Sequence, residues 1–125
     1  MNQMNLGWAV GIFEGEGCIH IPCVRPRHRQ PSPVLSVQMS DEDVLRRFTS
    51  LVGGNCSGPS LRVNRKQQKP IWRWSLGGRK TIPLLTLFLP HLGKRRRAKA
   101  VQALRAAHKL QHHAGFCRKD KTCCG

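Results

Sequence analysis

The sequence predicts a single α+β domain in which helices alternate with pairs of strands. A glycine-rich apolar stretch with helical spacing opens the chain. Two strand pairs with alternating apolar and polar residues follow, and a helix with its own start and stop signals separates them. Two further helices complete the order. The 125 residues suffice for one sizeable hydrophobic core but not for two.

The first predicted element is a helix over Leu6–Gly17. Glycines four apart form one stripe without side chains, along which another backbone can approach closely: Gly7, Gly11 and Gly15. A second stripe is apolar and suits the protein's own core: Leu6, Val10 and Phe13. A glycine inside a helix costs up to about 1 kcal/mol relative to alanine. Three in register therefore predict a contact that needs them.

Two carboxylates end this helix. Glu14 and Glu16 lie on different sides of it, at the end that carries the negative pole of the helix dipole. That placement is unfavourable without a cation. If two such helices met along the glycine stripe, two Glu16 carboxylates would converge at one end, which suits a divalent metal.

Residues 9–17, Ala-Val-Gly-Ile-Phe-Glu-Gly-Glu-Gly, resemble the nine-residue signature of LAGLIDADG homing endonucleases. Gly11, Gly17 and the two acidic positions match the signature. The sequence differs from it in having glutamate at both acidic positions and Ala-Val where the signature begins Leu-Ala. A longer carboxylate still binds metal.

The charge of the chain points to a polyanionic partner. Lysine and arginine outnumber aspartate and glutamate 22 to 6, for a formal net charge of +16. Nucleic acid is the commonest partner of so basic a domain, and a merely solubilising basic surface is the alternative. A membrane-surface protein is disfavoured because no basic amphipathic helix carries exposed aromatic residues.

Neither a membrane span nor an export signal is predicted. No apolar run reaches the roughly 18 residues that cross a bilayer, and the N-terminus lacks a basic region followed by an apolar stretch and a cleavage site. We therefore expect an intracellular protein that is not secreted, with its six cysteines mostly reduced.

The first strand pair flanks a cationic turn. Cys18–Arg25 and Val34–Met39 are predicted strands, and Pro22 makes the first an unusual central strand. In the second strand, Ser36 and Gln38 point away from the apolar side. The turn at 25–33 is either a solvated loop or a nucleic-acid contact, and its cations are Arg25, Arg27 and Arg29.

A capped helix separates the two strand pairs. Ser40 is its predicted N-cap, and three acids follow at the positive end of the helix dipole. Capping is the simplest account of these acids, and a catalytic role is the alternative. Gly53-Gly54 ends the helix.

The second strand pair begins at Asn55, and a basic turn at 65–70 interrupts it. In the strand Ile71–Leu76 the two tryptophans share the apolar side, which favours core packing over stacking on bases. Arginine, serine and asparagine side chains occupy the polar side. These side chains, with glutamine, suit reading base edges in a major groove, and they are Arg62, Asn64, Arg73 and Ser75.

Two helices complete the predicted domain. Ile82–Pro90 is apolar nearly all round, so we expect it to be buried. Lys94 opens the last helix with a run of four cations at the positive dipole end, which either an anionic partner or nearby carboxylates would offset. Its predicted apolar line is Val101, Leu104, Ala107 and Leu110.

The order of elements resembles the αββαββα core of the LAGLIDADG family over about residues 5–110. The resemblance implies a saddle-shaped antiparallel sheet in the major groove of DNA, with two signature helices meeting over the minor groove. This chain has one signature, so a homodimer is implied. The contact would involve the glycine stripe and Glu14.

The resemblance also implies an activity: a Mg²⁺- or Mn²⁺-dependent endonuclease that makes double-strand breaks at a long, pseudo-palindromic DNA target and promotes mobility of a host intron or intein. Glu16 and the Gly15 carbonyl would hold the metal. Lys94, or one of the three arginines after it, and Asp41 would lie near the scissile phosphates. From its charge, Lys66 of the basic turn is expected to contact the DNA backbone. The alternative is an RNA-binding intron maturase, or a DNA-binding protein without cleavage, on the same fold.

The resemblance does not extend to the end of the chain. We expect a domain over residues 1–111 and a flexible basic tail over 112–125. A zinc site in this tail is the alternative, although it lacks a C-x2-C pair. The candidate ligands are His112, His113, Cys117, Cys123 and Cys124.

Overall fold

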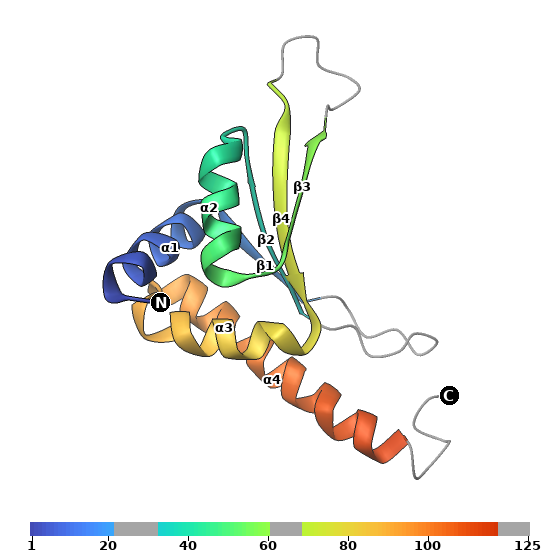
Figure 1. Cartoon of the computed structure of the whole chain (residues 1–125). Coiled ribbons are helices and arrows are strands. Elements are labelled where there is room, and N and C mark those ends of the chain that lie inside the picture. Colours follow the sequence, from blue (N-terminus) through green and yellow to red (C-terminus); the bar gives the residue numbers. More distant parts are fainter. Residues whose placement is uncertain (22–32, 61–68, 118–125) are drawn as a thin grey trace. The chain divides into compact units, whose positions relative to one another are not determined.

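The chain, in a computed structural model, is described over residues 1–21, 33–60 and 69–117, with side chains through residue 108. Its main elements, shown in Figure 1, are α1 (Gln3–Glu16), β1 (Gly17–His20), β2 (Val34–Met39), α2 (Glu42–Val52), β3 (Asn55–Ser60), β4 (Ile71–Gly77), α3 (Thr81–Phe88) and α4 (Lys94–Cys117). Short 3-10 turns, Gly78–Lys80 and Leu89–His91, flank α3. The predicted α+β class and the αββαββα order are confirmed.

The strands form one four-stranded antiparallel sheet in the order β1-β2-β4-β3. In the pair β3–β4, Asn55 lies opposite Ser75 and Ser57 lies opposite Arg73. The register shifts between Ser57 and Ser60, a stretch that contains a proline, which has no amide N–H to donate. The chain divides into two compact units, residues 1–18 with 35–76 and residues 19–34 with 77–125.

The core of the first unit forms where α2 meets β4. Phe48 of α2 and Trp74 of β4 are both fully buried, and their rings meet edge to face with centroids 4.8 Å apart. The indole N–H of Trp74 donates a hydrogen bond of 2.6 Å to the Gly53 carbonyl. Leu35 and Val37 of β2 are also buried. The alternation predicted for β2 and β4 is therefore confirmed.

Helix α1 packs against α2 in the same unit. Its N-cap is Asn2, whose side chain accepts a 2.8 Å hydrogen bond from the Asn5 amide. Its buried residues are Ala9, Val10 and Phe13. Gly17 follows the helix, and a Cβ there would collide with the Phe13 carbonyl and ring. The chain can therefore leave α1 for β1 at this point because residue 17 has no side chain.

In the second unit, α3 packs against α4. The fully or nearly fully buried side chains of α4 in its described part are Ala100, Ala103 and Ala107. Of the predicted apolar line, Ala107 is buried, Val101 and Leu104 are half-buried, and the side chain of Leu110 lies outside the described residues. Alanines at the contact let two helices approach more closely than leucines would.

Helix α3 is less buried than its composition predicts. Leu84, Leu85 and Phe88 are buried, but Leu87 is 43% exposed, and Pro83 is exposed as well. One side of the helix therefore faces away from the core, so the expectation of complete burial is wrong.

Two helix ends differ from the predictions. The N-cap of α2 is Asp41 rather than Ser40, and its side chain makes no capping hydrogen bond. Helix α4 continues to Cys117, past the predicted start of the tail at residue 112. None of the helices in the described part is long and apolar enough to cross a membrane.

Candidate metal and nucleic-acid site

The residues predicted to bind metal lie at the C-terminal end of α1. Gly15 and Glu16 are its last two residues, and both are exposed. The amide N–H of the following residue, Gly17, still donates to the Phe13 carbonyl. The Glu16 carboxylate therefore stands at the negative end of a complete helix, where a bound cation would be stabilised.

The glycine stripe of α1 is open. Gly7, Gly11 and Gly15 are exposed, and a Cβ built at each would meet nothing within 4 Å. Met4 precedes the stripe at helical spacing and is 82% exposed. The helix carries no charged side chain before Glu14, which is half-buried. α1 thus offers an uncharged face on which a second helix could lie closely.

The other two predicted catalytic residues lie on different elements. Asp41 is exposed at the start of α2, and no hydrogen bond joins it to Glu16 in the described part. Lys94 is the exposed first residue of α4, in the second unit. Within the described residues, no group of three or more His, Cys, Asp and Glu side chains could hold a metal. Of the predicted metal and catalytic residues, Gly15 and Glu16 are consecutive in α1.

The polar face of the sheet contains the described residues that were predicted to read bases. Gln38 and Arg73 are exposed, while Ser36 and Ser75 are half-buried. All four alternate with buried residues of β2 and β4. They therefore lie on the side of the sheet away from Phe48 and the core.

Strand β3 adds two residues to this face that the sequence analysis missed. Directly opposed residues of an antiparallel pair point to the same side of a sheet. Asn55 therefore joins Ser75, and Ser57 joins Arg73. The strand carries no apolar alternation of its own, so only its register against β4 could have revealed this. The other predicted DNA-binding residues lie outside the described residues: Arg25, Arg27, Arg29, Arg62, Asn64 and Lys66.

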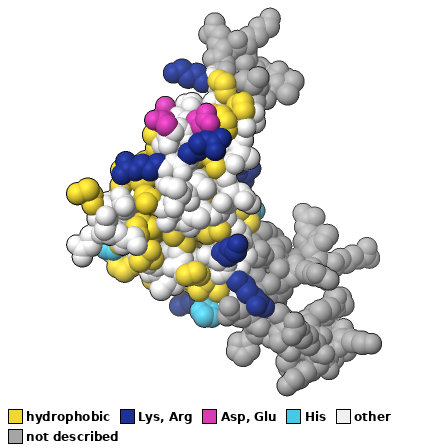
Figure 2. Space-filling model, in the orientation of Figure 1, with side chains coloured by type: hydrophobic (Ala, Val, Ile, Leu, Met, Phe, Trp, Pro, Cys, Tyr) yellow, Lys and Arg dark blue, Asp and Glu magenta, His cyan; other side chains and the backbone are white. Residues whose placement is uncertain are grey.

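Two arginines of α2 contact tryptophans. The guanidinium of Arg47 lies 4.0 Å from the ring centroid of Trp8, and that of Arg46 lies 5.3 Å from Trp72. Arg46 also donates a 2.7 Å hydrogen bond to Glu42, which raises the pKa of Arg46. Acidic and basic side chains lie next to each other over the start of α2 (Figure 2). Of the two tryptophans predicted to pack in the core, Trp74 is fully buried, whereas Trp72 is half-buried and carries the Arg46 contact.

Comparison with solved structures identifies the fold. The chain superposes on the homing endonuclease I-CvuI bound to its target with a TM-score of 0.67 and 21% identity, covering 87% of this chain and 69% of that one. The chain has the homing-endonuclease fold. A second I-CvuI complex matches it with a TM-score of 0.65 and 20% identity over the same shares of the two chains.

A more distant protein shares the homing-endonuclease fold. The archaeal intron-encoded enzyme I-Vdi141I, in complex with DNA, matches with a TM-score of 0.56 and 14% identity, covering 87% of this chain and 83% of that one. The two I-CvuI complexes were crystallised with 2 mM Ca and with 2 mM Mg, the latter with its DNA uncleaved. No protein-family model and no curated protein matches the sequence.

Proposed function

We propose that the chain is a metal-dependent, site-specific DNA endonuclease that acts as a homodimer. One observation carries the proposal: on a homing-endonuclease fold, α1 combines an open glycine face with an exposed carboxylate at its C-terminal end. The glycine face suits a second copy of α1, and the carboxylate suits a divalent cation. The proteins similar to this chain were crystallised on DNA.

The residues of α1 fit a hard divalent cation. Mg²⁺ takes oxygen ligands and is usually held by one or two carboxylates together with water and substrate phosphates. In a homodimer, Glu16 from each copy would supply these carboxylates, and the Gly15 carbonyl is a further oxygen ligand. A single chain therefore does not need to supply all the protein ligands of the ion. The bound metal would polarise the phosphate and help to activate water.

The remaining roles are proposed from side-chain charge and from the resemblance to homing endonucleases. The polar sheet face, Ser36, Gln38, Asn55, Ser57, Arg73 and Ser75, would read base edges, because arginine suits guanine and glutamine or asparagine suits adenine. The cations at 25–29 and Lys66 would contact phosphates. Lys94 would stabilise the negative charge that develops on the phosphate, and Asp41 would orient water or Lys94 near it.

Intron homing would be the biological consequence of such cleavage. A double-strand break at an intron- or intein-free copy of the host gene would promote insertion of the element. The proposed target is therefore the junction that forms when the DNA on either side of the host intron or intein is joined without it. A maturase that binds intron RNA would use the same basic surface. Binding of that RNA by the protein without metal, together with no DNA cutting, would favour the maturase.

The test is cleavage of a plasmid that carries this junction. We expect the wild type to linearise the plasmid in Mg²⁺. Glu16→Gln should reduce cutting at least a hundred-fold, an order-of-magnitude figure for losing a group that stabilises transition-state charge. Binding in Ca²⁺, measured by gel shift, should change little because the substitution keeps the side chain's shape. A Glu16→Gln variant that cuts in Mg²⁺ at the wild-type rate would contradict the metal assignment.

A further inference from the structure

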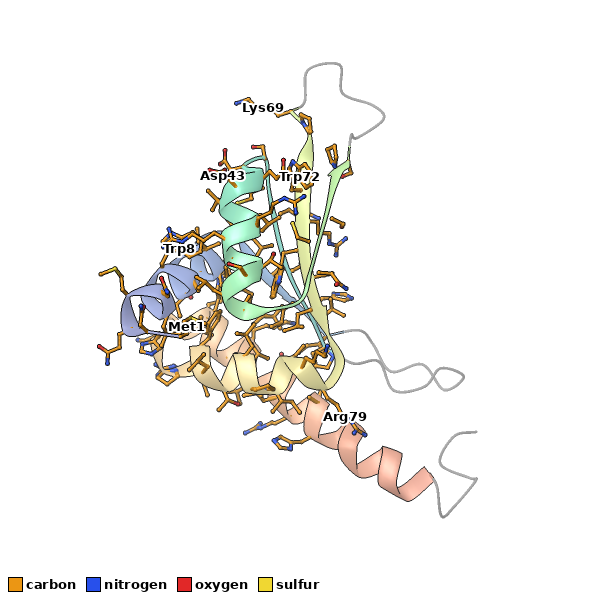
Figure 3. All side chains as sticks on the ribbon, in the orientation of Figure 1. Met1, Trp8, Asp43, Lys69, Trp72 and Arg79 are labelled. Atoms are coloured by element: carbon orange, nitrogen blue, oxygen red, sulfur yellow. The ribbon has the colours of Figure 1, made fainter. Side chains whose placement is uncertain are left out.

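The two arginine–tryptophan contacts connect α2 to two different elements. Arg47 lies over Trp8 of α1 at 4.0 Å, and Arg46 lies over Trp72 of β4 at 5.3 Å. Figure 3 shows these tryptophans on either side of α2. Both separations fall within the roughly 6 Å at which a cation is attracted to the face of an aromatic ring. Arg47 therefore contacts α1, the helix proposed to bind metal, and Arg46 contacts a strand of the sheet.

The glycine face of α1 has no side chain that could fix the rotation of the helix. The buried residues of α1 are Ala9, Val10 and Phe13, and Leu6, Trp8, Ile12 and Glu14 are half-buried. At 100° per residue, Trp8 lies about 140° around the helix from Phe13. A contact on Trp8, at the edge of the buried side of α1, therefore adds a restraint on rolling of the helix to that of the core residues. Trp8 is also the largest side chain of this helix.

Rotation of α1 decides where Glu16 points. Trp8 and Glu16 are eight residues apart, or about 12 Å along the helix axis. The helix between them is continuous, so a roll at Trp8 is carried to Glu16. It also turns the glycine face, whose central residue is Gly11.

We propose that Arg47 is a positioning residue, whose guanidinium over Trp8 fixes the rotation of α1 and thereby aims the Glu16 carboxylate at the metal. The role of Glu16 in this inference rests on the proposed function. The contact between Arg47 and α1 does not rest on the proposed function, because the structure shows that contact directly.

The test compares three variants of the full chain. Arg47→Gln removes the cation and keeps a polar side chain, whereas Arg47→Lys keeps a cation that can lie over the ring. Arg46→Gln is the matched control, since Arg46 is the neighbouring exposed arginine on α2 and contacts a tryptophan of another element. Two readouts are measured: hydrogen exchange of the α1 amides, and Mn²⁺ binding to the protein–duplex complex followed by electron paramagnetic resonance. The duplex is the proposed junction sequence.

We expect Arg47→Gln to speed exchange of the α1 amides about two- to five-fold, the factor that corresponds to losing one exposed cation–π contact. The Mn²⁺ concentration at half-saturation should rise by a similar factor. Arg47→Lys should restore both values towards those of the wild type. Arg46→Gln should leave both at wild-type values.

The outcomes separate this inference from the proposed function. A wild type that binds Mn²⁺ without cutting DNA would contradict the endonuclease and leave the positioning role of Arg47 standing. Unchanged exchange in Arg47→Gln would overturn the positioning role, and so would an equal effect of Arg46→Gln or a failure of Arg47→Lys to restore the wild-type values. Faster exchange with unchanged Mn²⁺ binding would also overturn it, because Glu16 would then not depend on Arg47.

Discussion

Arg73 shows what a single residue contributes to the sheet face. It is exposed on β4 and lies opposite Ser57 of β3, an uncharged residue. A bidentate contact between arginine and guanine discriminates against other bases by about 1–3 kcal/mol. In the proposed complex with DNA, few side chains of this face would therefore set the specificity.

We expect Arg73→Ala to relax selectivity at particular base pairs of the target by about 1–3 kcal/mol each. Lys69→Ala is the control, because Lys69 is an exposed lysine just before the same strand and would meet phosphates. It should weaken binding evenly on all sequences and reduce the salt dependence. Binding measured on a panel of single-base variants of the target distinguishes the two. An even loss from Arg73→Ala would count against base reading by β4.

Some residues of the candidate site could be predicted from the sequence and others could not. Gly15, Glu16 and the alternating residues of β2 and β4 follow from local patterns, so their places were predictable. Asn55 and Ser57 were not, because their positions depend on pairing with β4, which is far along the chain. The N-cap of α2 was predicted one residue early, since Ser40 and Asp41 are both good capping residues.

At the scale of elements, α2 is followed by two glycines, Gly53 and Gly54, whose surroundings differ. Gly53 and Gly54 have φ angles of 80° and 90°, which favour glycine. A Cβ at Gly54 would lie 2.6 Å from the Trp74 indole nitrogen, whereas a Cβ at Gly53 would meet nothing within 4 Å. Gly54 thus serves both the turn and the packing of Trp74.

Gly54→Ala should lower the free energy of unfolding more than Gly53→Ala does. Both variants place alanine at positive φ, at a cost of about 1–2 kcal/mol. Gly54→Ala adds overpacking against Trp74, worth about 1–3 kcal/mol. Chemical denaturation of the two variants measures the difference. Equal losses would mean that the backbone relaxes away from the indole.

The helices of the second unit show where element prediction fails. The apolar composition of α3 predicted burial all round, but a short helix at the edge of a core buries only one side, and Leu87 is exposed. In α4 the buried line consists of alanines, whose weak hydrophobicity gives little periodic signal, while the larger Val101 and Leu104 are half-buried. Packing against α3 overrides side-chain size here.

At the scale of the whole molecule, the order of elements was the most predictable property. Most of the helices and strands had a local signal, and together these signals predicted the αββαββα order that the structure confirms. The dimer, in contrast, is a proposal that rests on the number of sites that cleavage requires. One chain has one glycine face and one sheet, whereas two scissile strands require two sites, and a two-fold pair is the simplest solution. The charge of +16 on each copy opposes pairing, and a duplex would relieve it.

Gly11→Leu tests this pairing without disturbing the single chain. A Cβ at Gly11 meets nothing within 4 Å of the same chain, and leucine is a better helix former than glycine by up to about 1 kcal/mol. The melting temperature of the variant should therefore stay the same or rise. Any loss of assembly would then report on the contact with the second copy rather than on the fold.

The decisive measurement is sedimentation of the wild type and Gly11→Leu on the junction duplex, with plasmid cutting followed on the same samples. We predict two copies of the wild type per duplex and cutting in Mg²⁺. For Gly11→Leu we predict at most one copy per duplex and no double-strand cutting. A wild type that stays monomeric on its DNA, or a Gly11→Leu variant that pairs and cuts normally, would contradict the account.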